Sequence, residues 1–284
     1  MAKGLALTIG LNAVDPAHYQ GWDGQLTACE ADAKDMADIA KSKRFGVTTL
    51  LTAKATRGAV KKAISSAATT LKSGDIFLMT YSGHGGQLPD LNDEEPDGQD
   101  ETWCLFDGEL VDDEIYAMLS SFRSGVRVLV FSDSCHSGSV IKLAYLSTAV
   151  EDTPALRTAR GFSSDRPSRF RAMPPQVALR TYQANKSFYD PILTDKSLAR
   201  ARDAVKASAL LISGCQANQL SADGTFNGLF TGTLRRVWNG GKFKGDYRRF
   251  HKEILTRMPP DQSPNYFLVG TSDPGFEKQT PFAI

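Results

Sequence analysis

Two short stretches rich in glycine and serine carry residues that could act together in nucleophilic chemistry. "YSGHGGQ" contains His84, and "FSDSCHSGS" contains Cys135, 51 residues later. A cysteine thiolate is a strong nucleophile, and a neighbouring imidazole lowers the thiol pKa and can later protonate a leaving amine. These residue types therefore indicate attack by sulfur on an acyl group.

The residues beside this pair could complete such a site. The backbone N–H groups of Gly85 and Cys135 are candidates for an oxyanion hole, which needs fixed donors. No Asp or Asn stands out as a third member, so we expect a backbone carbonyl to orient the imidazole. His136 is a competing base, but neighbours in an extended chain point to opposite faces, which favours His84. The alternative is an inert buried thiol, which we expect of Cys29, Cys104 and Cys215.

Both motifs follow apolar runs that predict strands, and ligands of open α/β sheets bind beyond the carboxyl ends of strands. Six such runs are predicted as strands: Leu5–Leu11, Val47–Leu51, Asp75–Ser82, Val126–Asp133, Ala209–Cys215 and Asn265–Gly270. Helical patterns lie between them, at residues 26–42, after a Thr56 cap, and at Asp112–Ser121, Phe230–Trp238 and Tyr247–Arg257. This alternation predicts an α/β sandwich with a mostly parallel sheet.

Two segments interrupt this pattern. Pro89–Glu101 is densely acidic, and we expect it to be a loop. Glu151–Pro175 is rich in Arg, Ser and Pro and shows no period, which predicts a mobile surface loop.

Three polar residues are expected near the His–Cys pair. Asp133 lies two residues before Cys135, Ser82 lies two before His84, and Asp32 follows the first strand. Two converging carboxylates would suit a cationic side chain, above all a guanidinium held by a two-pronged contact. The alternatives are a solvated charge at a helix start for Asp32 and a structural hydrogen-bond acceptor for Asp133.

At these residues the chain resembles the caspase-like cysteine peptidases, in particular the metacaspases and their prokaryotic relatives, the orthocaspases. The resemblance rests on "YSGHGG", "DSCHSG", "LTACEADAKDM", "LVDDEI" and "LLISGCQANQ". It implies a catalytic dyad of His84 and Cys135 and a caspase-like three-layer sandwich with a six-stranded sheet. The separation of the two residues also agrees with the caspase pattern, in which the His lies about 50 residues before the Cys. The "QACRG" of animal caspases is replaced by "DSCHSG", which favours the metacaspase branch.

The resemblance implies one peptidase domain, 1–284, and a substrate class. We expect a large-subunit-like part at 1–150, the mobile loop at 151–175, and a small-subunit-like part at 176–284. Metacaspases use the positions of Asp32, Ser82 and Asp133 to select Arg or Lys before the scissile bond. This predicts self-processing in the 151–185 segment, with candidates Arg157, Arg160, Arg166, Arg169 and Arg171. The alternative is an intact basic loop that shields the site.

Two rival functions remain open. One is a catalytically silent caspase-like scaffold in a stress or defence complex, although a scaffold has no need of an intact His–Cys pair. The other is a metal-dependent hydrolase built from His84 with Asp90, Asp93 and Asp97, which lacks a second His and regular ligand spacing.

Calcium is the cofactor that the resemblance brings into question. Asp100, Asp112 and Asp113 match the aspartates with which metacaspases often bind calcium, but the fourth position is Lys142. An ammonium would repel the cation and could itself pair with the carboxylates. We therefore predict that no cofactor is required and that activity is independent of calcium.

Bulk composition limits the partners. The net charge of +1 gives no field that would favour nucleic acid or an anionic membrane. Four cysteines without CxxC spacing favour a reducing compartment, so we predict a cytoplasmic protein. No stretch approaches the roughly 18 apolar residues of a membrane span, and the N-terminal apolar run is expected to be a strand rather than a signal peptide. The predicted partners are protein or peptide substrates with Arg or Lys, and a monomer is expected.

Overall fold

The structure is a computed structural model that describes residues 2–92, 98–134, 170–214, 227–260 and 262–284. Its main element is a six-stranded sheet with the strand order β2-β1-β3-β7-β8-β9. Every pairing is parallel except that of β8 with β9. The strands are β1 (Gly4–Gly10), β2 (Gly46–Leu51), β3 (Ile76–Ser82), β7 (Arg127–Asp133), β8 (Ser208–Ser213) and β9 (Asn265–Gly270). All six predicted strands are therefore confirmed.

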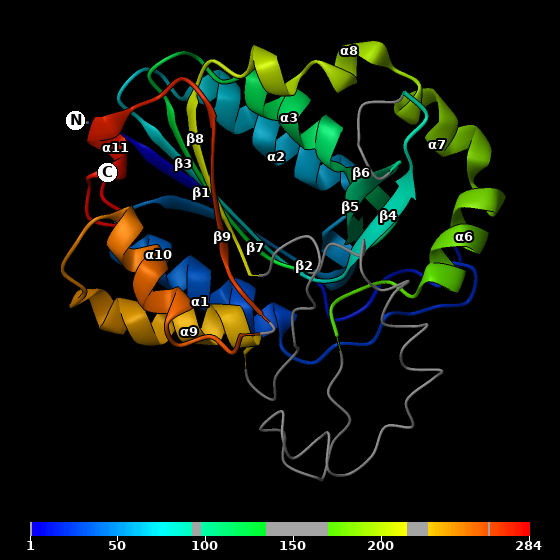
Figure 1. The fold of residues 1–284 in the computed structure, drawn as a ribbon, viewed down its shortest axis with the longest axis horizontal. Coiled ribbons are helices and arrows are strands. Elements are labelled where there is room, and N and C mark those ends of the chain that lie inside the picture. The colour runs from blue at the N-terminus through cyan, green and yellow to red at the C-terminus, as the bar shows by residue number, and fades with distance from the viewer. Residues whose placement is uncertain (1, 93–97, 135–169, 215–226, 261) are drawn as a thin grey trace, which may run out of the picture.

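Helices cover both faces of this sheet, which confirms the three-layer sandwich (Figure 1). One face carries α1 (Cys29–Ser42), α9 (Leu229–Trp238) and α10 (Tyr247–Leu255), and the other carries α2 (Arg57–Thr70) and α3 (Asp112–Ser120). As predicted, the side chain of Thr56 caps α2 by accepting from the Ala59 N–H. The N- and C-termini lie close together at one end of the sheet (Figure 1).

The two central strands explain why the sequence signal was strong. Every residue of β3 and β7 is buried, as expected for parallel strands covered on both faces. Alternate side chains enter opposite cores: Phe77 and Met79 face α2 and α3, whereas Leu78 faces α1, α9 and α10. Ser82 and Asp133, at the carboxyl ends, continue the alternation on the α1 and α9 side.

A second sheet was not predicted from the sequence. It has the strand order β4-β5-β6, with β4 at Gly85–Pro89, β5 at Gln99–Leu105 and β6 at Gly108–Val111. The expected acidic loop at Pro89–Glu101 is therefore wrong at both ends: Pro89 closes β4, and Gln99–Glu101 belongs to β5. The acidic composition of this segment gives no strand signal. The two strands pair nevertheless, because the backbone hydrogen bonds of an antiparallel pair do not depend on side-chain hydropathy.

The remaining elements follow the 151–175 segment or connect the layers. They are α6 (Pro175–Ala184), α7 (Lys186–Leu193), α8 (Lys196–Ala199), α11 (Pro274–Glu277) and 3₁₀ turns at Thr52–Lys54, Arg202–Ala204 and Asn239–Gly241. Residues 151–169 lie outside the described residues. The end of that segment does not lie at the surface as expected, because the side chains of Arg171 and Met173 are buried.

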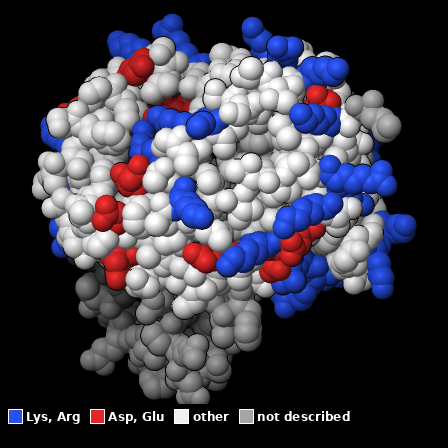
Figure 2. All heavy atoms as spheres, turned by 180° about the vertical axis from the view of Figure 1, so that it is seen from behind, with Lys and Arg blue, Asp and Glu red and all other residues white. Residues whose placement is uncertain are grey.

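Charged side chains of both signs are interspersed over the face opposite to the view of Figure 1, as Figure 2 shows. Among the helices of the described ranges, none is long and apolar enough to cross a membrane.

Candidate active site

The two motif strands are direct neighbours in the sheet. β3 pairs with β7 in parallel register, with Ser82 opposite Asp133 at their carboxyl ends. His84 and Cys135 each follow two residues after this pair along the chain. Cys135 itself lies outside the described residues. The described parts of the two strands therefore end side by side at one edge of the sheet.

The imidazole of His84 is held by the segment that connects β1 to α1. Its Nε2 lies 3.0 Å from the carbonyl oxygen of Gly24, which supplies the orienting backbone carbonyl that we expected. The Trp22 ring packs on it with 4.7 Å between ring centroids. A neutral imidazole that donates from Nε2 carries its lone pair on Nδ1. Nδ1 is therefore the basic nitrogen of this ring.

The backbone of His84 is fixed by the second sheet. Its carbonyl oxygen accepts from the Tyr81 hydroxyl at 2.6 Å and from the Cys104 N–H at 2.9 Å. The Tyr81 ring stacks on Trp103 with 4.4 Å between centroids. β5 thus fixes the backbone at His84. Burial raises the pKa of the Cys104 thiol well above its usual range, so Cys104 has the character of an inert thiol.

Gly85, predicted as an oxyanion donor, has a partner from the end of the 151–175 segment. Its N–H donates to the carbonyl oxygen of Arg171 at 2.9 Å, and its own carbonyl accepts from the Met173 N–H at 2.8 Å. Gly85 and Ala172 thereby form a short parallel bridge. The backbone of 171–173 lies along the start of β4, and β4 begins at the residue that follows His84.

The three predicted pocket residues come together around one cation, the guanidinium of Arg171. Its Nη2 donates to Asp32 Oδ2 at 2.8 Å. Its Nη1 donates to Ser82 Oγ at 2.8 Å and lies 3.0 Å from both Asp133 Oδ2 and the Asp133 carbonyl oxygen. The Arg171 side chain is fully buried (0% exposed). Asp32 is therefore not the solvated helix charge considered above, and the carboxylates do converge on a guanidinium.

The N-terminal end of α9 holds both carboxylates in place. Asp133 Oδ2 accepts from the Thr231 N–H at 3.0 Å and from the Thr231 hydroxyl at 2.7 Å. Asp32 accepts from the Gly228 N–H at 3.1 Å and from Asn227 Nδ2 at 2.8 Å. Unsatisfied N–H groups and the dipole at a helix N-terminus favour negative charge. Asp133 thus also serves as the structural acceptor considered above.

Burial acts against these charges. Burial raises the pKa of Asp32, and the Arg171 guanidinium, which favours the ionised carboxyl, offsets only part of that rise, while Asp133 adds to it. The space that remains between Asp32, Ser82, Asp133 and the neighbouring apolar residues is about 10 Å³. That is no more than one water molecule needs, so the core side of the two carboxylates is closely packed.

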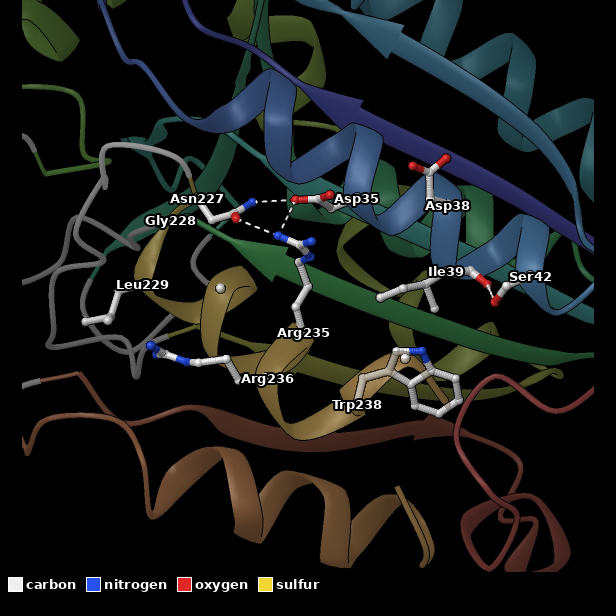
Figure 3. A pocket seen from close by; sticks show the side chains of 12 residues that line it. Asp35, Asp38, Ile39, Ser42, Asn227, Gly228, Leu229, Arg235, Arg236 and Trp238 are labelled. Carbon is white, nitrogen blue, oxygen red and sulfur yellow. Dashed lines mark hydrogen bonds and ion pairs between the residues drawn. The ribbon is translucent and has the colours of Figure 1, made fainter. Parts of the chain in front are cut away.

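A larger hollow of about 740 Å³ opens between α1 and α9 (Figure 3). On its wall, Asn227 donates to Asp35 at 2.7 Å and accepts from Arg235 at 2.8 Å, and Arg235 also pairs with Asp35 at 2.8 Å. Asn227 and Gly228, which both bind Asp32, line this hollow. The Asp35–Arg235 pair therefore supports the wall between the hollow and the acidic pocket.

These predicted residues lie outside the described ranges: Cys135, His136, Lys142, Arg157, Arg160, Arg166, Arg169, Cys215, Asp93 and Asp97. Within the described ranges, no group of three His, Cys, Asp or Glu side chains could hold a metal ion. Asp100, Asp112 and Asp113 lie within these ranges, so these three aspartates do not form such a group.

Sequence reasoning missed the residues that support the site. Trp22 and Gly24 hold His84, and Asn227, Gly228 and Thr231 hold the carboxylates. An Asn-Gly pair at 227–228 is a turn signal just before a predicted helix, and it could have indicated the helix N-terminus. Trp22 and Gly24 lie in a segment without periodicity, which gave no signal.

Comparison with known proteins gives one family. The profile described as "Caspase domain" matches residues 3–282. Metacaspase-1 of Ajellomyces capsulatus is 31% identical over 254 residues, which cover 82% of this chain and 68% of that protein. Metacaspase-1A of Aspergillus clavatus is 36% identical over 160 residues, which cover 51% of this chain and 36% of that protein. The match thus spans little more than a third of the length of the Aspergillus relatives.

Two solved structures share the fold. A crystal structure of a Geobacter sulfurreducens protein, a structural genomics target, is 59% identical with a TM-score of 0.87, covering 99% of this chain and 98% of that one. Caspase-1 of Spodoptera frugiperda has a TM-score of 0.55 at 13% identity, covering 95% of this chain and 86% of that one. The second likeness concerns the fold alone.

Proposed function

The chain belongs to the caspase domain family of cysteine peptidases, and we propose that it is an endopeptidase that cleaves proteins or peptides after Arg or Lys. His84 and Cys135 form the catalytic dyad in this proposal. Gly85 and Cys135 supply the oxyanion donors, and Asp32, Ser82 and Asp133 bind the cationic side chain before the scissile bond. Self-processing within 151–185 follows from the same selectivity.

One observation carries the selectivity. A fully buried guanidinium is bound by both carboxylates and by the Ser82 hydroxyl, with contacts of 2.8–3.0 Å. A buried charge is tolerated only when it is paired and hydrogen-bonded. The same groups would leave two carboxylates unpaired around an apolar side chain, so they favour a cationic one.

The proposed chemistry uses His84 as a proton carrier. Nδ1 takes the thiol proton of Cys135, and the thiolate attacks the carbonyl carbon after the bound Arg or Lys. The Gly85 N–H stabilises the oxyanion, as its contact with a peptide carbonyl supports. The imidazolium then protonates the leaving amine, and water hydrolyses the thioester.

Hydrolysis of a blocked Arg–fluorophore peptide in the presence of a chelator tests this proposal. Cys135→Ala should reduce the rate by about 10⁴-fold or more, as loss of a nucleophile does in comparable hydrolases. His84→Gln should do the same. The matched control is Cys104→Ala, which removes a buried thiol and should leave the rate within a few-fold.

The rival functions give different results in the same assay. A silent scaffold would show no hydrolysis by the unsubstituted protein, and a metal-dependent hydrolase would be inactive with the chelator but insensitive to Cys135→Ala. Either result would remove the proposal.

A further inference from the structure

We infer that Asn227 and Arg235 are positioning residues for the pocket carboxylate Asp32. Arg235 lies on α9, at the hollow between α1 and α9, and holds the Asn227 amide. That amide in turn holds one oxygen of Asp32, so that the other oxygen meets the bound cation. This inference rests on the proposed function and adds two residues that determine specificity at the same pocket.

The two oxygens of Asp32 have different partners. Oδ1 accepts from Asn227 Nδ2 at 2.8 Å and from the Gly228 N–H at 3.1 Å. Oδ2, which lies 3.2 Å from the same N–H, accepts from Ser82 Oγ and from Arg171 Nη2, each at 2.8 Å. The Asn227 amide therefore anchors Oδ1 and leaves Oδ2 directed at the guanidinium.

The Asn227 amide is itself held at both ends, as Figure 3 shows. Its Nδ2 also donates to Asp35 Oδ2 at 2.7 Å, and its Oδ1 accepts from Arg235 Nη1 at 2.8 Å. The same Nη1 lies 2.8 Å from Asp35 Oδ2 and closes a triangle of contacts. A side-chain amide has one donor end and one acceptor end. A reversed Asn227 would turn its oxygen towards two carboxylates and its NH2 group towards a guanidinium, so the contacts fix one orientation.

The charge of Arg235 matters because the pocket carboxylate has an acidic neighbour. Asp32 and Asp35 are three residues apart on α1, so they lie on one face of the helix, and both accept from the same Asn227 nitrogen. Arg235 neutralises Asp35 and secures the amide that supports Asp32. Burial raises the pKa of Asp32, whereas the hydrogen bond from Asn227 favours its ionised form. An ionised Asp32 is the form that binds a cation.

These contacts lead from the surface to the pocket. The side chain of Arg235 is 45% exposed and that of Asp35 is 24% exposed, whereas Asp32 is fully buried (0%). An exposed ion pair contributes little to folding by itself. The loss of Arg235 should therefore act mainly on Asp32, through Asn227, which distinguishes a positioning role from a merely structural one.

The first measurement is a double-mutant cycle of urea unfolding in the whole chain carrying Cys135→Ala, with Arg171 as the cation in the pocket. When Asp32 is present, Arg235→Gln should raise the unfolding equilibrium constant about 5- to 20-fold. In Asp32→Asn the same change should raise it no more than about twofold, because a neutral side chain needs less support. If Asp32→Asn does not unfold cooperatively, Asn227→Ala takes its place with the same expectation. An equal effect of Arg235→Gln in both backgrounds would overturn the inference.

The second measurement is hydrolysis of the blocked Arg–fluorophore peptide by proteins that carry Arg171→Gln, so that no internal guanidinium competes for the pocket. Arg235→Gln should raise KM about 5- to 20-fold and leave kcat within about threefold, because it weakens binding rather than the chemical step. Arg235→Lys keeps the charge and a donor, so its KM should stay within about threefold of the parent.

The matched control is Arg236→Gln. Arg236 lines the same hollow and donates to Thr233 Oγ1 at 2.8 Å. Its loss should change KM by less than about twofold, since this contact does not reach the pocket. If Arg171→Gln gives no cooperative unfolding transition, the unfolding cycle of the first measurement decides the inference.

Failure of the inference differs from failure of the proposed function. If neither the unsubstituted protein nor Arg171→Gln hydrolyses the peptide, the peptidase proposal fails, and the unfolding cycle still decides whether Arg235 acts on Asp32. If they hydrolyse it and Arg235→Gln has the same KM as Arg236→Gln, the peptidase proposal stands and the positioning role is refuted.

Discussion

Ser82 and Asp133 lie opposite each other in parallel register at the carboxyl ends of β3 and β7. This pairing has two consequences for the site. It brings two polar side chains to one spot on the α1 and α9 side of the sheet, where both contact Arg171. It also places the ends of the two strands, which precede His84 and Cys135 in the sequence by two residues, side by side at one edge of the sheet.

Loss of one pocket charge should weaken the binding of arginine. Asp32→Asn keeps the shape of the side chain but replaces a charged acceptor that contacts Arg171, Ser82, Asn227 and Gly228. A hydrogen bond to a charged group contributes about 1.5–3 kcal/mol, so kcat/KM for an Arg peptide should fall about 10- to 150-fold, mainly through KM. Steady-state kinetics on the processed protein measures this change.

Asp38→Asn is the control for that substitution. Asp38 lies on the same helix with a side chain that is 73% exposed, and it pairs with Lys41 at the surface. Its removal should leave kcat/KM unchanged within about twofold, since exposed ion pairs contribute little. Equal effects of the two substitutions would exclude a specific role for Asp32.

A methyl group at Gly228 should close the pocket. A Cβ there would lie 2.6 Å from Cζ of Arg171, far inside contact distance. The backbone itself would accept alanine, because φ is −58°, so the effect of Gly228→Ala is steric. Overpacking costs about 1–3 kcal/mol, which predicts a loss of about 5- to 150-fold in kcat/KM for Arg peptides, together with a lower thermal midpoint of the uncut chain.

Gly232→Ala provides the matched comparison on the same helix. Its Cβ would meet its nearest neighbour, the Cβ of Asn227, at an ordinary 3.4 Å. Alanine in a helix interior is favoured over glycine by about 0.5–1 kcal/mol, so this variant should be slightly more stable and fully active. A Gly228→Ala protein that behaves in the same way would show that the guanidinium does not bind where the structure has it.

The central strands of the main sheet could be predicted because they are buried on both faces. Continuous apolar runs such as Ile76–Ser82 differ clearly from the helical patterns between them. The second sheet could not, since β4 reads Gly-Gly-Gln-Leu-Pro and β5 begins Gln-Asp-Glu. Neither segment is apolar enough to stand out, and the pairing between them is a property of the backbone.

The site was predictable only where position along a strand decides it. Ser82 and Asp133 follow from their places at the ends of adjacent strands, and Asp32 from its place after β1. The contact of Trp22 with His84 joins residues that lack any common period. Arg171 was the hardest to foresee, because it comes from an Arg-rich, Pro-rich segment whose composition predicts exposure, while its partners lie more than 35 residues away in the chain.

Calcium should not be needed for activity. The resemblance gives Lys142 the place of a fourth ligand, and its ammonium would oppose a divalent cation near Asp100, Asp112 and Asp113. We therefore expect the same rate of Arg-peptide hydrolysis in excess chelator and in millimolar calcium. Lys142→Asp should introduce a calcium dependence, which a titration would detect. A steep activation of the unsubstituted protein by calcium, reversed by the chelator, would contradict the proposal.

The buried carboxyl of Glu109 should make stability depend on pH. Burial raises its pKa to about 8, although the Thr102 hydrogen bond and Arg57 act in the opposite direction. The folded protein therefore holds a proton that the unfolded chain releases near its ordinary pKa of 4.5. Stability from this group is complete below about pH 4.5 and is lost as the pH rises through about 8, with a slope of up to about 1.4 kcal/mol per pH unit.

Glu109→Gln tests that dependence, because glutamine is neutral at every pH and keeps an acceptor for the Thr102 hydroxyl, which lies 2.6 Å from Glu109 Oε2. Urea unfolding should be measured between pH 5 and 9. The free energy of unfolding of Glu109→Gln should rise relative to that of the unsubstituted protein as the pH rises, with the largest difference above pH 8. Glu253→Gln is the control: its pKa is lowered by Arg257 at the surface, so its removal should not change the slope in this range. Parallel curves for Glu109→Gln and the unsubstituted protein would mean that Glu109 is already ionised in the folded state at neutral pH.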